Sequence, residues 1–299
     1  MFKKSLAVVP FLAFAMALAA TPESTPPPGK VTAAEIADRN VAARGGLQAW
    51  RAVQTMSFEG KLGAGGGRRP TLPVAIPGQG TSAGRRGPTG SSALPTRPAE
   101  EVQLPFVMEL KRPRKMHFEL QFKGQMALQV YDGANGWKLR PFLNRREVEP
   151  YTTEEMKAAS MQADLDGPLV DYAAKGTQIE LAGTEKVENR DTYKLKLTLK
   201  NGQAIHVWVD AETFLEAKME GQPRRLDGTY HPVEVYFRDY RPINGLQIPF
   251  VLETKVLAVA KTALGFKDPL VPAERTIIEK VVVNPKLDDA LFTKPKASK

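Results

Sequence analysis

The sequence contains no cysteine, and only three of its 299 residues are histidine. Without cysteine the chain can form neither disulfide bonds nor thiolate metal sites, and it cannot carry an acylated cysteine. The histidines, His117, His206 and His231, do not have the spacing of a metal site. We therefore expect no metal and no cofactor, and a fold that is stabilised by an ordinary hydrophobic core.

Recognisable catalytic motifs are also missing. The sequence has no His-Glu-x-x-His, Gly-x-Ser-x-Gly or Walker-type segment. Asp164 and Asp166 are a candidate carboxylate pair for acid–base work or cation binding, but their place before Pro168 is better explained by helix capping. Because no nucleophile, base and orienting group can be proposed together, we expect a protein that is not an enzyme.

Long apolar runs are absent except at the N-terminus. Lys3 and Lys4 precede an apolar run over residues 6–18, and residues 17–19 have the small-residue pattern of a signal peptidase site. The alternative is an uncleaved anchor, but the run is shorter than the ~20 residues of a spanning helix, and Pro10 interrupts it. We predict a cleaved signal peptide over residues 1–20.

Acidic residues are fewer than basic ones, and the formal net charge is +9. A basic surface can contact nucleic acid, anionic lipid head groups or an acidic partner. Export makes nucleic acid the least expected of these partners. A basic surface that only keeps the protein soluble is the remaining alternative.

Two segments have a composition that does not suit a packed core. Residues 21–30 are rich in proline and are predicted to form a tether. Residues 63–100 are rich in glycine, proline and serine and contain two Arg-Arg pairs, which predicts a disordered insertion after the first strand. The arginine pairs are candidates for contact with lipid or a partner protein, and an inert loop is the alternative. We expect a single domain over residues 31–295 and a tail over 296–299.

Helix signals open the domain. Residues 32–35, Thr-Ala-Ala-Glu, form a capping box that predicts a helix over about 33–43, ending at Gly45 and Gly46. A short second helix is expected through Leu47 and Trp50.

Further helix signals stand in the middle of the chain. A second capping box at residues 152–155 predicts a helix near 156–161. Pro168 suits the first turn of a third short helix over about 169–174.

Alternating apolar and polar residues dominate the rest of the chain. Such a pattern with a period of two predicts antiparallel strands that have one buried and one wet face. We expect roughly nine to eleven strands, and a sheet of this width should be strongly curved. The apolar sets that carry the pattern include Leu104, Phe106, Met108 and Leu110; Met116, Phe118, Leu120 and Phe122; Tyr193, Leu195 and Leu197; and Phe237 with Phe250.

Several turn motifs together resemble the LolA-like periplasmic lipoprotein carriers. They are Lys-Arg-Pro at 111–113, Asp-Gly at 132–133 before Trp137, the segments 209–216 and 237–250, and the closing segment 287–295. The resemblance covers most of the chain outside the insertion. It implies a mostly β (α+β) fold: a strongly curved antiparallel half-barrel with short helices on its concave side, in a monomeric periplasmic protein.

The resemblance also implies a binding site for the acyl chains of a lipoprotein or lipid. Residues expected to line the apolar cavity are Phe106, Met108, Leu110, Met116, Phe118, Leu120, Phe122, Tyr193, Leu195, Leu197, Phe237 and Phe250. Arg112 occupies the position of an arginine implicated in handing the lipoprotein on, where it can bond carbonyls and hold a lid closed. A solvated turn residue is the alternative for Arg112.

The partners that this interpretation implies are an inner-membrane transporter, an outer-membrane acceptor and transient membrane contact. Two alternatives to a carrier stay open. One is an envelope sensor of the same fold, an interaction protein that recognises lipoproteins or lipids and signals by binding a partner. The other is a structural domain whose cavity is filled by its own side chains.

Overall fold

A computed structural model of the protein describes residues 31–64, 68–70, 96–98, 101–141, 145–226, 228–259 and 272–296. The predicted signal peptide over 1–20 and the tether over 21–30 lie outside the described residues, as does most of the predicted insertion over 63–100. Within that insertion, the described strands β2 (Arg68–Pro70) and β3 (Thr96–Pro98) pair with each other.

Three α-helices occur among the described residues: α1 (Ala33–Ala43), α2 (Leu47–Ala52) and α3 (Thr153–Gln162). Both predicted capping boxes are present. Thr32 and Glu35 exchange hydrogen bonds at the start of α1, and Thr152 and Glu155 do so at the start of α3. Within the described part of the chain, no helix has the length and apolar character needed to cross a membrane.

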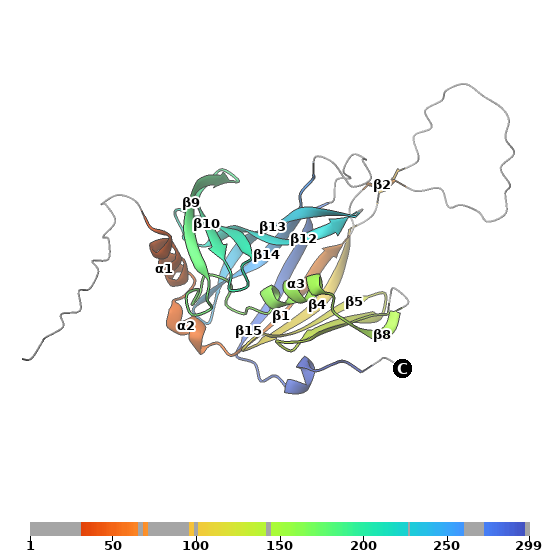
Figure 1. Ribbon diagram of the computed structural model, residues 1–299. Coiled ribbons are helices and arrows are strands. Elements are labelled where there is room, and N and C mark those ends of the chain that lie inside the picture. Colours follow the sequence, from red (N-terminus) through yellow and green to blue (C-terminus); the bar gives the residue numbers. More distant parts are fainter. Residues whose placement is uncertain are drawn as a thin grey trace, which may run out of the picture. The chain divides into compact units, whose positions relative to one another are not determined.

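The rest of the domain is a curved antiparallel sheet of thirteen strands (Figure 1). Its order is β8-β7-β6-β5-β4-β1-β15-β14-β13-β12-β11-β10-β9, so β8 and β9 are edges and the sheet is not closed. This confirms the predicted fold class. The strands are β1 (Thr55–Ala64), β4 (Val102–Lys111), β5 (Lys115–Phe122), β6 (Gln125–Tyr131), β7 (Gly136–Arg140), β8 (Arg145–Pro150), β9 (Gln178–Val187), β10 (Arg190–Thr198), β11 (Ala204–Asp210), β12 (Glu216–Leu226), β13 (Thr229–Ile243), β14 (Leu246–Val256) and β15 (Glu274–Val283).

The sheet has two strands more than the upper end of the expected range. The two edges explain why sequence patterns underestimate the count. Edge strand β9 exposes most of its side chains, and β8 is largely charged. Neither strand therefore carries the alternation of apolar residues that marks a strand with one buried face.

The centre of the sheet joins the two ends of the domain. β15 lies between β1 and β14, and Met56 of β1 pairs with Val283 of β15. The register shifts at Gly60, where a Cβ atom would lie 2.1 Å from the backbone oxygen of Ile277. Only glycine fits this close approach of two backbones.

One buried cluster lies on the concave side, between the sheet and the helices. Trp50 of α2 and Ala159 of α3 pack in it against side chains of the central strands, among them Met56 and Phe58 of β1. Figure 1 shows α3 in front of β1 and β4, with α1 and α2 near β9 and β10. The helices thus cover part of the concave side.

The helix predicted over residues 169–174 does not form. These residues make a series of turns within the α3–β9 connection, which we define as residues 163–177. Asp171 has φ +51°, a left-handed conformation that interrupts a helix. Leu169 and Val170 are fully buried there, so apolar packing is satisfied without helical hydrogen bonding.

Candidate ligand-binding face and the Arg112 network

Six of the residues predicted to line the cavity lie together on β4 and β5. Three cross-strand pairs place them on one face: Phe106 with Leu120, Met108 with Phe118, and Leu110 with Met116. Opposite residues of an antiparallel pair project to the same side, so their side chains form a continuous apolar strip. The rings of Phe106 and Phe118 stack with centroids 5.7 Å apart.

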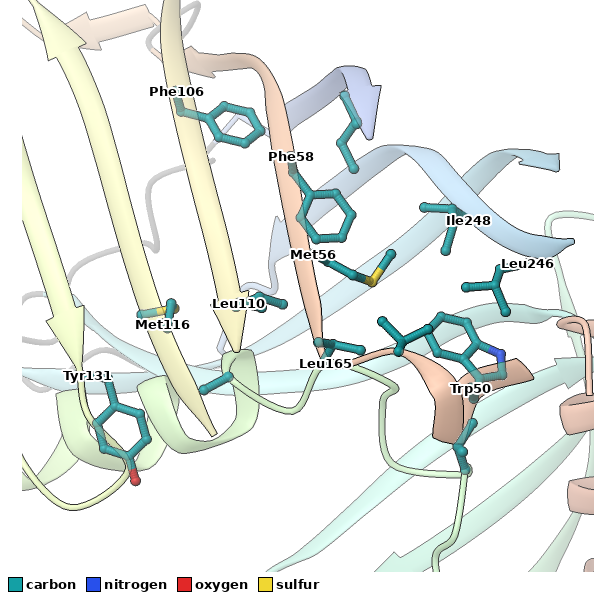
Figure 2. Packing of buried hydrophobic residues seen from close by; sticks show 14 of the residues in the cluster. Trp50, Met56, Phe58, Phe106, Leu110, Met116, Tyr131, Leu165, Leu246 and Ile248 are labelled. Carbon is teal, nitrogen blue, oxygen red and sulfur yellow. The ribbon is translucent and has the colours of Figure 1, made fainter. Parts of the chain in front are cut away.

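Burial changes along this strip. Phe106, Leu110 and Met116 are buried in the central cluster together with Phe250, whereas Met108, Phe118 and Leu120 are only partly buried at its margin. Figure 2 shows the cluster from close by, with Phe58 and Met56 beside the strip and Trp50 near Leu246. The partly buried margin of the strip still exposes some apolar surface, which a ligand can remove from water.

The other predicted lining residues are not part of this cluster. Leu195 and Leu197 are fully buried on β10, opposite Val207 and Ile205 of β11. Tyr193 stacks on Phe214 with ring centroids 6.1 Å apart. The structure therefore does not bring the β10 residues together with the β4–β5 strip.

Phe122 and Phe237 are each partly buried. The Lys123 ammonium lies 5.3 Å from the centre of the Phe122 ring, at the end of β5. Phe237 borders a surface hollow of about 400 Å³, with Arg190, Glu216 and Tyr240 among its other lining residues. The lining role of these residues stays a prediction.

A second hollow, of about 390 Å³, lies between the α1–α2 turn and the α3–β9 connection. Val41 and Leu47 line it on one side and Leu169 on the other. Val41 and Leu47 also pack against the central cluster. This hollow therefore borders the apolar interior at the helical end of the domain.

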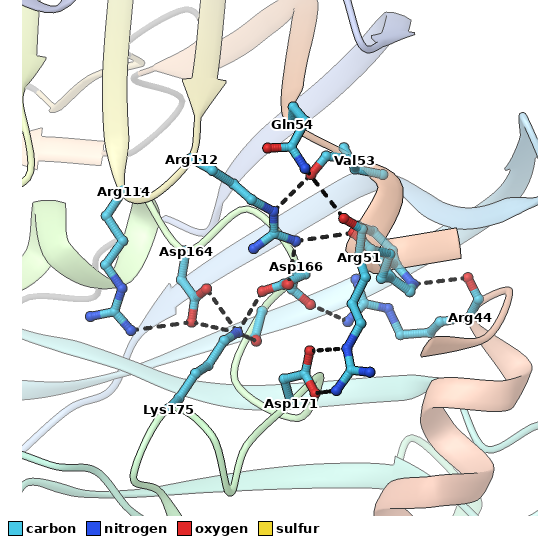
Figure 3. Close-up of polar contacts among 12 residues, drawn as sticks. Arg44, Arg51, Val53, Gln54, Arg112, Arg114, Asp164, Asp166, Asp171 and Lys175 are labelled. Atoms are coloured by element: carbon cyan, nitrogen blue, oxygen red, sulfur yellow. Dashed lines mark hydrogen bonds and ion pairs between the residues drawn. The ribbon is translucent and has the colours of Figure 1, made fainter. Parts of the chain in front are cut away.

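Arg112 follows β4 and reaches three acceptors (Figure 3). Its Nε donates to the Val53 carbonyl at 2.7 Å, and Nη2 donates to the Trp50 carbonyl at 3.0 Å and to Asp166 Oδ2 at 2.6 Å. The two carbonyls lie at the end of α2, where the last backbone acceptors are not all satisfied within the helix, and the Trp50 carbonyl also accepts from the Val53 N–H at 3.1 Å. Arg112 is therefore bound to the structure around it, unlike a solvated turn side chain, and its role in hand-off stays a prediction.

Asp166 is the centre of the network, and only 1% of it is exposed. Lys175 Nζ donates to Asp166 Oδ1 at 2.5 Å and to Asp164 Oδ1 at 2.9 Å. Burial disfavours ionisation of Asp166, but Lys175 and Arg112 outweigh it and hold the pKa of Asp166 below its ordinary value. At Asp164 burial prevails and raises the pKa.

Two further arginines tie the α3–β9 connection to the helices. Arg44 Nη1 donates to the Asp166 carbonyl at 2.8 Å and to Glu216 Oε1 at 3.2 Å, while its guanidinium lies 4.4 Å from the Trp50 ring centre. Arg51 binds both carboxylate oxygens of Asp171, at 2.9 and 2.6 Å. Together with Arg112 and Lys175, these two arginines fasten one irregular segment.

Sequence reasoning missed most of this network. It interpreted Asp164 and Asp166 as helix caps, but no helix follows them and their carboxylates meet Lys175 and Arg112 instead. Arg44 and Arg51 stand at the ends of α1 and α2, where cations are common because they suit the helix dipole. Their partners become visible only when the connection is folded against them.

Comparison with known proteins supports the fold. No protein-family model matches the chain, and no curated protein matches it. A solved LolA superfamily protein from Nitrosomonas europaea has a TM-score of 0.50 and 14% identity, over 89% of this chain and 99% of that one. A DUF1329 family protein from Desulfovibrio piger has a TM-score of 0.48 and 13% identity, over 87% of this chain and 97% of that one. The fold is LolA-like.

Proposed function

From the LolA-like fold, we propose that this protein is a non-enzymatic periplasmic carrier. It binds acyl chains of a lipoprotein or lipid on the concave face of the sheet and moves them across the envelope. The observation that carries this proposal is the partly buried margin of the apolar strip, formed by Met108, Phe118 and Leu120 beside the buried cluster.

The strip suits an acyl chain by its chemistry. Its exposed part is apolar along two neighbouring strands, and each methylene that leaves water there contributes about 0.8 kcal/mol. A chain of ordinary length would be retained strongly. Release must therefore depend on an acceptor with higher affinity or on a change in the protein.

The α3–β9 connection is the segment we expect to control access. Leu165 and Val170 of this connection pack into the same cluster as the strip, while Arg112 and Lys175 fasten it from the polar side. Displacing it would uncover cluster side chains. An inner-membrane transporter as donor, an outer-membrane acceptor and a monomeric state are parts of the same proposal.

The test is native mass spectrometry with lipid extraction on protein purified from its own periplasm. A co-purifying acylated species supports the carrier. A clean apo mass, together with no binding of a fatty acid or hydrophobic dye on titration, contradicts it and favours the interaction-protein alternative.

A matched pair of variants locates the binding face. Leu120 lies on the apolar strip opposite Phe106, and its neighbour Gln121 lies on the other face of β5. Leu120→Lys should reduce dye and fatty-acid binding strongly, while Gln121→Lys should leave it unchanged. Equal effects of the two substitutions would place the ligand elsewhere.

A further inference from the structure

The end of the sheet opposite Arg112 exposes apolar side chains. We call it the far end; there β1, β5, β12 and β14 finish, and β4, β6, β13 and β15 begin. Of the four large apolar side chains that are exposed in the described part of the chain, three lie there: Val102 (46% exposed), Met126 (39%) and Tyr230 (52%). The fourth, Leu181, lies inside edge strand β9.

Each of these three residues stands at the start of its strand. Val102 is the first residue of β4, and Met126 and Tyr230 are the second residues of β6 and β13. Val102 projects to the same face of β4 as Leu104 and Phe106, which is the concave side of the sheet. Met126 instead pairs with Gln121, so it projects to the opposite, wet face. The exposed apolar surface therefore belongs to the rim of strand ends and not to one face of the sheet.

Cations accompany aromatic rings along the same rim. The Arg225 guanidinium lies 5.9 Å from the Tyr230 ring centre, and Lys123 Nζ lies 5.3 Å from that of Phe122. Both cationic side chains are exposed. An apolar or aromatic body beside a long cationic side chain is the combination that proteins use at a lipid–water interface.

The breadth of the rim indicates the size of the partner. β6 and β13 are six strand spacings apart in the sheet order, or roughly 29 Å along the sheet at about 4.8 Å per spacing. A small anion cannot reach such distant side chains at once. A membrane surface can, because it is continuous over many lipid head groups.

Several cations near Arg112 are engaged by carboxylates, whereas two cations on the far rim lie beside aromatic rings. At the Arg112 end, Arg112, Lys175 and Arg51 are each held by a carboxylate of the α3–β9 connection. At the far end, Lys123 and Arg225 extend beside aromatic rings on the rim, in a protein whose net charge is +9. The exposed cations Lys123 and Arg225 of the far end complement anionic head groups.

We propose that the far end of the sheet is the surface by which this protein docks on an anionic lipid bilayer. Val102, Met126 and Tyr230 enter the boundary between head groups and acyl chains, while Lys123 and Arg225 contact the lipid phosphates. This surface contains none of the six residues of the apolar strip, so docking does not require that an acyl chain is the cargo.

Co-sedimentation of the full exported chain with large unilamellar vesicles tests the proposal. Vesicles of equal phosphatidylglycerol and phosphatidylcholine should bind the protein, and pure phosphatidylcholine should bind it at least tenfold less. Binding should weaken as salt rises, because counter-ions screen exposed charges. Equal binding to both vesicles, no binding to either, or binding of a polyglutamate peptide without vesicle binding would overturn the proposal.

Variants assign the contact to the rim. Lys123→Gln with Arg225→Gln should reduce binding by about fivefold per cation removed. The control is Lys186→Gln with Lys286→Gln, two exposed lysines at the Arg112 end, which should bind like the unchanged protein. Circular dichroism confirms that each variant is folded. If the control double variant weakened vesicle binding as much as the rim double variant, the net charge of the protein alone would explain binding. That result would contradict a defined docking surface.

The absence of native cysteine permits a direct map of the contact. Single substitutions Val102→Cys, Met126→Cys and Tyr230→Cys, each labelled with an environment-sensitive dye, should shift to the blue when anionic vesicles are added. Leu181→Cys, with an exposed fraction like that of Met126, is the control and should not shift. A shift at Leu181 with none at the rim positions would refute the assignment.

Discussion

Arg112 connects three parts of the chain that are distant in sequence. Its guanidinium bonds two carbonyls at the end of α2 and one carboxylate of the α3–β9 connection, while its backbone N–H donates to the Gln54 carbonyl. A hydrogen bond in which one partner is charged is stronger than a hydrogen bond between two neutral groups. Arg112 therefore couples the turn after β4 to the segment that covers the cluster.

Arg112→Leu should lower the free energy of unfolding by about 2–3 kcal/mol, because it leaves the Asp166 carboxylate buried with one partner fewer. If the connection controls access, the variant should also release a bound acyl chain faster. Urea denaturation and dye-release kinetics measure the two effects. Arg114→Leu is the control: its pair with Asp164 is long, at 3.8 Å, and half exposed, so a similar loss there would argue against a special role for Arg112.

Asp210 provides a pH-dependent test at the turn between β11 and β12. Burial works against its ionisation, but the N–H groups of Thr213 and Glu212 donate to its carboxylate and hold the pKa of Asp210 below its ordinary value. A carboxyl whose pKa is lower in the folded state stabilises the protein above its unfolded pKa, near 3.9, and loses that contribution as pH falls.

Asp210→Asn should therefore cost about 1–2 kcal/mol at pH 7 and much less at pH 3. Urea denaturation of both proteins at the two pH values measures the difference. Asp191→Asn, which alters a largely exposed side chain, should have little effect at either pH. If the loss of unfolding free energy caused by Asp210→Asn were the same at both pH values, the lowered pKa of Asp210 could not be its source.

The α3–β9 connection illustrates how an irregular element is held in place. It forms turns and bends rather than a helix or a strand between α3 and β9. It is held by a set of ion pairs and by four buried apolar side chains, Ala163, Leu165, Leu169 and Val170. Segments with few backbone hydrogen bonds open at lower free energy than the strands around them. The ion pairs should therefore control how often this segment opens.

Lys175→Met should accelerate amide hydrogen exchange over residues 164–177 while the strands keep their protection. The reason is that Lys175 lies between Asp164 and Asp166 and pairs with both, so its removal leaves two nearby carboxylates that repel each other, with one cation fewer beside them. Mass-spectrometric exchange resolves the segment. Lys186→Met removes an exposed ion pair and should change nothing there. Faster exchange across the whole sheet would instead indicate general destabilisation.

The whole molecule depends on pairing between its two ends. β1 and β15 are separated by more than two hundred residues, yet they form neighbouring strands in the centre of the sheet. Such distant pairing requires closing a long loop before it contributes stability, and this slows folding. The sheet is continuous only when β15 is in place between β1 and β14.

Gly60→Ala tests this central junction. The new Cβ would lie 2.1 Å from the Ile277 carbonyl oxygen, so β1 and β15 must separate, and we expect a loss of about 1–3 kcal/mol. Gly63→Ala in the same strand is the control, because its closest contact is the end of the Glu101 side chain, which can move aside. Thermal unfolding compares the two. If Gly63→Ala lost as much stability as Gly60→Ala or more, the close backbone approach at Gly60 would not be what limits this junction.

The sequence by itself determined the elements that depend on local chemistry. Capping boxes located α1 and α3, and strict alternation located strands such as β4 and β5 and identified their apolar face. Those signals are local because hydrogen bonds at a helix start, and the up-and-down arrangement of strand side chains, involve residues close in the chain. The curved antiparallel fold followed from their number and from the turn motifs.

Only the tertiary structure decided what lies beside what. It placed β15 between β1 and β14, separated Leu195 and Leu197 of β10 from the β4–β5 strip, and replaced a predicted helix by an irregular connection. It also brought Arg112 to Asp166, 54 positions away in the sequence. Ion pairs and strand neighbours of this kind join residues tens to hundreds of positions apart, and no pattern within a short window of sequence records such a distance.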